Sequence, residues 1–154
     1  MKHLKHLLKQ PLSNLPTKVA IFILIVALLG FVDATYLTVE HYKGAIPPCS
    51  VTGGCEVVLT SIYSEIMGIP TSLVGSIYYL LVLIGAFAYL ESKNLVLLKW
   101  SLLLTIPAFI FSLWFVYIQV FELYSYCIYC LGSFLTSTIL FVTTMEIFAR
   151  YQEK

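Results

Sequence analysis

Long apolar stretches alternate with short polar segments along the whole chain. Four of these stretches, residues 19–39, 72–90, 100–121 and 126–145, are long enough to cross a bilayer. A hydrocarbon core about 30 Å thick needs about 20 helical residues at a rise of about 1.5 Å each. None of the stretches alternates apolar and polar residues as a barrel strand does, and a helix bonds its own backbone groups where lipid cannot. The pattern predicts an all-α integral membrane protein with a four-transmembrane-helix bundle.

The composition agrees with this fold class. Of the 154 residues, 60% are hydrophobic and 11% are charged, whereas soluble domains have about 45–50% apolar and about 25% charged residues. A soluble domain of this length could not bury so much apolar surface. The formal net charge of +1 provides no strong basic field. A soluble enzyme, a disordered chain and a nucleic-acid-binding protein with a basic face are therefore excluded.

The positions of the cations predict the orientation of the bundle. Eight of the nine Lys and Arg residues lie on one side, namely Lys2, Lys5, Lys9, Lys18, Lys93, Lys99, Arg150 and Lys154. By the positive-inside rule this side is the cytoplasm. We expect a basic cytoplasmic segment at 1–18, a membrane domain at 19–150 and a cytoplasmic tail at 151–154. The protein would then lie in the inner (plasma) membrane, with both termini in the cytoplasm.

The N-terminal region has a second interpretation. Its basic leader, the apolar run at 19–32 and the sequence Val32-Asp33-Ala34 resemble a secretory signal peptide with a cleavage site. Apolar residues resume at Tyr36, which favours a membrane span. The cysteines lie outside the cytoplasm under either interpretation.

The connection between the first and second predicted spans, residues 41–71, is long and too apolar to be disordered. Connections of this length usually carry function. A segment after Gly54 places five apolar residues on one helical face, namely Cys55, Val58, Leu59, Ile62 and Ile66. We expect a short half-helix that lies on the membrane surface and caps the bundle, ended by Gly68-Ile69-Pro70.

All four cysteines lie on the external side of this arrangement. Cys49 and Cys55 lie in the long connection, and Cys127 and Cys130 form a Cys-x-x-Cys motif where the fourth helix begins. A helix N-terminus carries partial positive charge and unpaired N–H groups, which stabilise the thiolate that exchanges disulfides. Cys130 lies about 4.5 Å deeper than Cys127 at the helical rise. We therefore expect Cys127 to face the loop and Cys130 to face the bundle interior.

This placement suggests a relay of electrons. A Cys49–Cys55 disulfide would take electrons from a soluble dithiol and, once reduced, attack a Cys127–Cys130 disulfide. The inner pair would then reduce a lipid-soluble acceptor, for which a quinone is the obvious choice.

Other interpretations of the cysteines remain open on spacing alone. Two structural disulfides would also suit an external loop. A Cys₄ zinc site is disfavoured, because its ligand pairs usually have two to four intervening residues and Cys49 and Cys55 have five. Buried free thiols are an unusual use of a Cys-x-x-Cys motif at a helix start.

Several short motifs carry a family resemblance. They are Pro48-Cys49, Gly54-Cys55-Glu56-Val57-Val58, Ser61, Gly68-Ile69-Pro70, Gly75 with Tyr78-Tyr79, and Cys127-Ile128-Tyr129-Cys130. Over residues 22–145 the chain resembles the vitamin K epoxide reductase family in its bacterial form. The combination of two cysteine pairs, the loop serine and a four-span frame is far more specific than a lone Cys-x-x-Cys motif.

The resemblance implies a membrane thiol:quinone oxidoreductase that supports disulfide bond formation. Its electrons would come from a thioredoxin-fold protein and pass to ubiquinone or menaquinone. It implies that Cys127 and Cys130 are the active pair, with Cys130 beside the quinone. Cys49 and Cys55 would be the shuttle pair, with Cys55 favoured to meet the partner and Cys49 to attack Cys127. Ser61 would help to hold the cap over the quinone, or would simply bond its own backbone.

Two positions depart from the animal members of the family. Those members hold vitamin K with an asparagine and a tyrosine, whose positions correspond to Thr71 and Phe134 here. The resemblance therefore implies quinone reduction but leaves vitamin K epoxide reduction in doubt. Thr71 and Phe134 are nevertheless candidates for the quinone pocket, and no metal is expected. Because the chain ends at Lys154, we expect the thioredoxin-fold partner to be a separate protein.

Two other functions are compatible with the sequence. Asp33 is an ionisable group within a predicted span, and such groups often mark proton pathways, so a small proton-coupled transporter is one alternative. A structural membrane subunit held together by disulfides is the other.

Pro107 removes a hydrogen bond from the third span and predicts a kink, which would either widen a pocket or ease packing.

Overall fold

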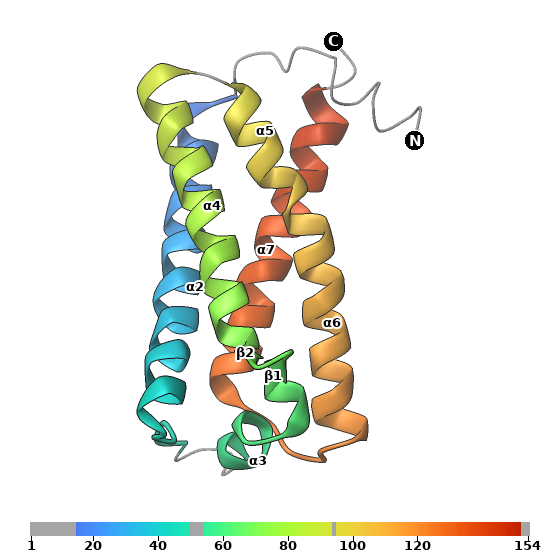
Figure 1. Ribbon diagram of the computed structural model, residues 1–154. Coiled ribbons are helices and arrows are strands. Elements are labelled where there is room, and N and C mark those ends of the chain that lie inside the picture. Colours follow the sequence, from blue (N-terminus) through green and yellow to red (C-terminus); the bar gives the residue numbers. More distant parts are fainter. Residues whose placement is uncertain (1–14, 50–53, 94, 152–154) are drawn as a thin grey trace.

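The chain forms a bundle of long helices with a folded loop at one end (Figure 1). The structure is a computed structural model that describes residues 15–49, 54–93 and 95–151. Its four membrane-length segments are α2 (Thr17–Lys43), α4 (Thr71–Ser92), α5 (Leu95–Leu103) together with α6 (Thr105–Phe121), and α7 (Ile128–Tyr151). The predicted fold class is therefore confirmed. Helix α2 begins and α7 ends at one end of the bundle, and the folded loop lies at the other.

The limits of the spans differ from those predicted. Helix α2 is longer than 19–39 and stops at Gly44, whose left-handed backbone (φ 67°) lets its N–H reach the carbonyls of the last turn. Helix α4 extends the predicted 72–90 by one or two residues at each end. Helix α7 begins at Ile128 rather than 126 and continues well past 145. Most of the predicted segments 1–18 and 151–154 lies outside the described residues.

The third span is interrupted, as Pro107 predicts. Prolines lack the N–H that would bond the carbonyl four residues earlier, and the break falls at Leu104, between α5 and α6. Around the break, the Ser101 and Thr105 hydroxyls donate to backbone carbonyls three residues earlier. The span also begins earlier than the predicted residue 100, because Leu95 to Lys99 are already helical.

The loop contains less helix than expected. Helix α3 (Cys55–Leu59) is followed by a 3₁₀ turn, η1 (Ile62–Ser64), and by a two-stranded hairpin of β1 (Glu65–Ile66) and β2 (Ile69–Pro70). The half-helix predicted to continue to Ile66 therefore stops at Leu59, and Ile62 is 84% exposed instead of sharing the buried face. The helix stops where Ser61 takes an extended backbone, and the Thr60 and Ser61 hydroxyls donate to carbonyls of the preceding turn.

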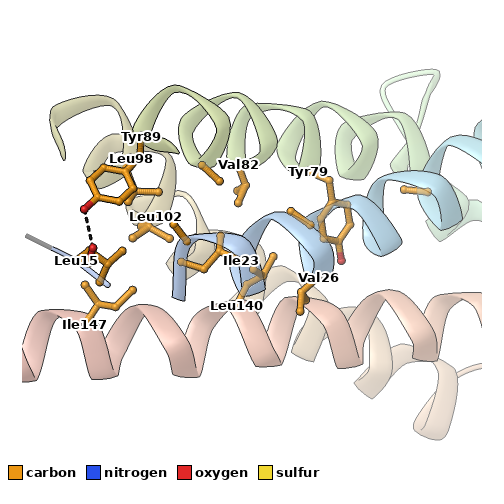
Figure 2. Close-up of a cluster of buried hydrophobic side chains, with 14 residues drawn as sticks. Leu15, Ile23, Val26, Tyr79, Val82, Tyr89, Leu98, Leu102, Leu140 and Ile147 are labelled. Carbon is orange, nitrogen blue, oxygen red and sulfur yellow. Dashed lines mark hydrogen bonds between the residues drawn. The ribbon is translucent and has the colours of Figure 1, made fainter. Parts of the chain in front are cut away.

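The helices pack around an apolar core in the half of the bundle far from the loop. Helix α4 packs along α2, α5 packs on α4, and α7 packs on both α2 and α6. Figure 2 shows Ile23, Val82, Leu102 and Leu140 meeting from four segments. Tyr89 closes this end, because its hydroxyl donates to the Leu15 carbonyl at 2.7 Å. Large apolar side chains such as Leu29, Phe87 and Ile110 are more than half exposed, as expected of surfaces that face lipid.

One tyrosine joins three helices near the middle of the bundle. A Cβ atom added to Gly30 of α2 would collide with the ring of Tyr79 of α4. The Tyr79 hydroxyl lies 2.7–3.1 Å from four oxygens of α7, which belong to Ser133 (carbonyl and hydroxyl), Thr136 and Ser137. The missing side chain at Gly30 thus lets α2 and α7 approach the same ring.

We predict that Gly30→Ala destabilises the protein by about 1–3 kcal/mol, because overpacking displaces a ring that hydrogen bonds hold in place. Gly132→Ala is the matched control, since nothing lies within 4 Å of its added Cβ. The measurement is the thermal unfolding midpoint of each variant in the same detergent. Equal midpoints for the two variants would contradict the close packing at Gly30.

Candidate active site

The two cysteine pairs meet at the loop end of the bundle. Cys49 and Cys55 are joined by a disulfide, with their Cα atoms 5.9 Å apart, and Cys127 and Cys130 are free. Cys55 and Cys127 are both fully buried and share one apolar cluster with Val58. Cys49 and Cys130 pack against the edge of this cluster. The sequence predicted that the pairs would be near each other, and the structure brings them into one packed unit.

A glycine makes this close approach possible. Gly54 precedes α3, and a Cβ built on it would lie 2.7 Å from the amide nitrogen and 2.8 Å from the carbonyl oxygen of Tyr126. Any side chain at residue 54 would therefore push the start of α3 away from the backbone just before Cys127. The second loop cysteine and the first helix-start cysteine are held together by backbone contact.

Cys127 occupies the position that caps α7. Its carbonyl accepts the first helical hydrogen bond, from the Leu131 N–H at 3.0 Å, and its Sγ accepts the Cys130 N–H at 3.4 Å. A side-chain acceptor at this position satisfies an otherwise unpaired N–H of the first turn. The expectation that the motif uses the helix start is therefore confirmed for the position of Cys127.

Gln119 supports this cap and was missed by the sequence interpretation. It is a fully buried polar residue of α6. Its Oε1 accepts the Cys127 N–H at 3.0 Å and its carbonyl accepts the Ser125 N–H at 3.1 Å. A polar residue within an apolar span was the only available signal, and its partner could not be inferred from sequence.

The surroundings of Cys127 favour its thiolate. The pKa of the Cys127 thiol is lowered, first by a hydrogen bond from the Cys130 thiol and then by the backbone N–H groups of Cys130 and Tyr129. Burial and the negative charge of Asp33 act in the opposite direction but are outweighed. Cys127 is thus suited to be the sulfur that exchanges with the loop pair.

A cavity of about 1130 Å³ lies inside the loop half of the bundle. The four residues predicted for a quinone pocket, Cys130, Ser61, Thr71 and Phe134, all line it. Most of the remaining wall is apolar, and it includes Pro107 and aromatic rings of α4 and α6. Cys127 is not among the lining residues, which agrees with the expected difference between an inward Cys130 and a loop-facing Cys127.

Three of the candidate pocket residues also make contacts with other parts of the protein. The Ser61 hydroxyl donates to the Val58 carbonyl at 2.7 Å, and the Thr71 hydroxyl donates to the Ser64 carbonyl at 3.1 Å. Phe134 stacks on Phe109, with ring centroids 6.4 Å apart. Ser61 therefore bonds its own backbone, as one interpretation of the sequence held, and also lines the cavity. Within the described ranges, no three His, Cys, Asp or Glu side chains gather as metal ligands.

We predict that Cys130 sets the ionisation of Cys127. In a Cys49→Ser/Cys55→Ser variant, alkylation of Cys127 by iodoacetamide should reach half its maximal rate below the ordinary thiol midpoint of about pH 8.5. A further Cys130→Ala change removes the thiol donor, so the midpoint should move to higher pH. Mass spectrometry of the peptide containing Cys127 gives both curves. An unmoved midpoint would show that the Cys130 thiol does not stabilise the Cys127 thiolate.

Comparison with known families agrees with this geometry. A sequence model described as the vitamin K epoxide reductase family matches residues 21–145, which is most of the chain and includes all four cysteines. The matched region spans the helices, the folded loop and the lining of the cavity. The chain belongs to the vitamin K epoxide reductase family.

Proposed function

We propose that the protein is a membrane thiol:quinone oxidoreductase that supports disulfide bond formation. Family membership indicates an oxidoreductase rather than a transporter or a structural subunit. In the proposal, a separate thioredoxin-fold protein supplies electrons to Cys49–Cys55, which pass to Cys127–Cys130 and then to ubiquinone or menaquinone. The observation that carries the proposal is the single packed cluster that contains both cysteine pairs beside a large apolar cavity.

The burial of the loop cysteines favours one order of exchange. Cys55 is fully buried against Cys127, whereas Cys49 is half-buried. We therefore propose that the partner attacks Cys49 and that Cys55 attacks Cys127, which is the reverse of the order favoured from sequence.

Each step of this order conserves atoms and electrons. A partner thiolate bonds to Cys49 and releases the Cys55 thiolate, which bonds to Cys127 and releases Cys130. The second partner thiolate then frees Cys49, and Cys49 attacks Cys55 to restore the loop disulfide. Cys127 and Cys130 are left as a dithiol.

The cavity suits a quinone by size and by chemistry. Its volume of about 1130 Å³ can hold a ring with part of an isoprenoid tail, since ligand pockets usually measure about 300–1,000 Å³. Cys130 lies in the wall, where its sulfur can reach a bound ring. Thr71 and Phe134 stand where animal members hold vitamin K with an amide and a phenol, so we propose quinone rather than vitamin K epoxide as the acceptor.

The distribution of cations supports one orientation in the inner membrane. The end of the bundle opposite the loop carries Lys18, Lys93, Lys99 and Arg150. The loop end carries Lys43. By the positive-inside rule, we propose that the termini are cytoplasmic and that the cysteines face the oxidising external compartment.

Quinone reduction tests the proposal directly. With a reduced thioredoxin-fold protein as donor and decylubiquinone as acceptor, the wild-type protein should reduce the quinone, and Cys130→Ser should lower the rate to that of the uncatalysed reaction. Ser92→Ala is the control, because Ser92 lies at the far end of α4 and is exposed. Loss of quinone absorbance gives the rate. Equal turnover by wild type and Cys130→Ser would end the proposal.

The order of exchange has its own test. In Cys49→Ser/Cys130→Ser, the remaining Cys55 and Cys127 should form a disulfide readily under mild oxidation, because they are packed together. In the matched variant Cys55→Ser/Cys130→Ser, Cys49 and Cys127 should link more slowly. Non-reducing mass spectrometry follows both reactions. Faster linkage of Cys49 would restore the order expected from sequence.

A further inference from the structure

A carboxyl group without a partner lies in the wall of the same cavity. Asp33 belongs to α2 and lines the cavity together with Cys130. Its Oδ2 is buried and has no hydrogen-bond partner among the described residues. Neither ion pair found in those residues includes Asp33, since the pairs are His41–Glu65 and Lys43–Glu40.

An unpaired carboxyl group within a membrane-spanning helix calls for an explanation. An acidic residue within a membrane-spanning helix is costly, and such residues generally face the bundle interior and act in proton or ion transfer. A buried polar atom is normally hydrogen-bonded, and each exception calls for an explanation. No neighbouring side chain among the described residues hydrogen-bonds the buried oxygen of Asp33, which leaves this oxygen open to a molecule bound in the cavity.

Asp33 also lies within electrostatic range of the reactive sulfur. Its negative charge opposes ionisation of the Cys127 thiol. Asp33 and Cys130 line the same cavity, so a proton that leaves the thiol pair has a carboxylate within the same space.

The proposed reaction needs such an acceptor. Oxidation of the Cys127–Cys130 dithiol releases two electrons and two protons as the S–S bond forms, and reduction of a quinone to a quinol takes up two of each. The exposed lining of the cavity is mostly apolar, so few side chains beside a bound ring can carry a proton. A group that accepts a proton from sulfur and donates it to oxygen would couple the two half-reactions.

We propose that Asp33 is a catalytic residue that transfers a proton from the thiol pair to the bound quinone, an inference that rests on the proposed function. The Asp33 carboxylate accepts the proton of the Cys130 thiol as the S–S bond forms. It then donates this proton to a quinone oxygen, and the carboxylate is regenerated. The proton that Cys127 lost earlier to water is balanced by one that the second quinone oxygen takes from water.

Two half-reactions separate this role from a structural one. In the first, protein carrying the Cys127–Cys130 disulfide is mixed with a reduced thioredoxin-fold protein in the absence of quinone. In the second, protein in the dithiol form is mixed with decylubiquinone, and quinone absorbance is followed over one turnover. Asp33→Asn should slow the second half-reaction at least about tenfold and change the first less than about twofold. The KM for decylubiquinone should change little, because the loss lies in proton transfer rather than in binding.

Matched variants keep the test decisive. Glu40→Gln removes a carboxylate from the same helix, outside the cavity lining, and should leave both half-reactions unchanged. Asp33→Glu and Asp33→Gln have side chains of equal size, so only the carboxyl variant should retain the second half-reaction. This pair also decides the question if Asp33→Asn does not fold. Added formate should partly restore Asp33→Asn, which repair of a folding defect would not do.

The possible outcomes are distinguishable. Wild-type turnover with an equally fast second half-reaction in Asp33→Asn would overturn the role of Asp33 and leave the proposed function intact. Equal slowing of both half-reactions, with a lower unfolding midpoint, would assign Asp33 a structural role and also overturn the inference. Absence of quinone reduction by the wild-type protein would instead remove the proposed function on which the inference rests.

Discussion

The contact between the start of α3 and the backbone just before α7 is the interaction on which the site depends. Thiol–disulfide exchange requires direct attack of one sulfur on another, so a loop cysteine is useful only if it reaches the helix start. The bare backbone at Gly54 permits this approach, and Val58 buries the sulfurs of Cys55 and Cys127 from solvent. Gln119 holds the other side of the contact through the Cys127 N–H.

The same loop also closes the cavity. Leu59, Ser61 and Glu65 belong to the segment that carries Cys55, and all three line the cavity wall. Glu65 is further tied to α2 by its ion pair with His41, at 3.2 Å. A displacement of the loop that changes the sulfur contacts would therefore also change the enclosure of the cavity. Under the proposed function, sulfur exchange and access to the acceptor would both depend on the position of this loop.

The sequence predicted the features that depend on local patterns. Four apolar segments, the helix start at the Cys-x-x-Cys motif and the break caused by Pro107 each follow from composition or backbone chemistry within a few residues. The end of α3 was not predicted, because the apolar periodicity of the sequence continues through Ile66 although the backbone becomes extended at Ser61.

Long-range contacts could not be predicted in the same way. The role of Gln119 depends on a residue eight positions away across a turn, and the importance of Gly30 depends on the ring of Tyr79 in another helix. Neither residue carries a motif of its own. The burial of Cys55 relative to Cys49, on which the proposed order of exchange rests, likewise follows from how the loop folds back on the bundle.

The hydrogen bonds of Tyr79 have a consequence for how the two sulfur pairs can move. They attach α4 to α7 at Ser133, one helical turn beyond Cys130, and again at Thr136 and Ser137. Sliding or rotation of α7 would break several of these bonds together. The position of the inner sulfur pair is therefore fixed relative to α4. Among the described residues, the loop that carries the outer pair contains the short helix α3, the 3₁₀ turn η1 and a hairpin of two-residue strands. A change in the distance between the two sulfur pairs would therefore require the loop to leave its contact with the start of α7, while α7 itself stays in place.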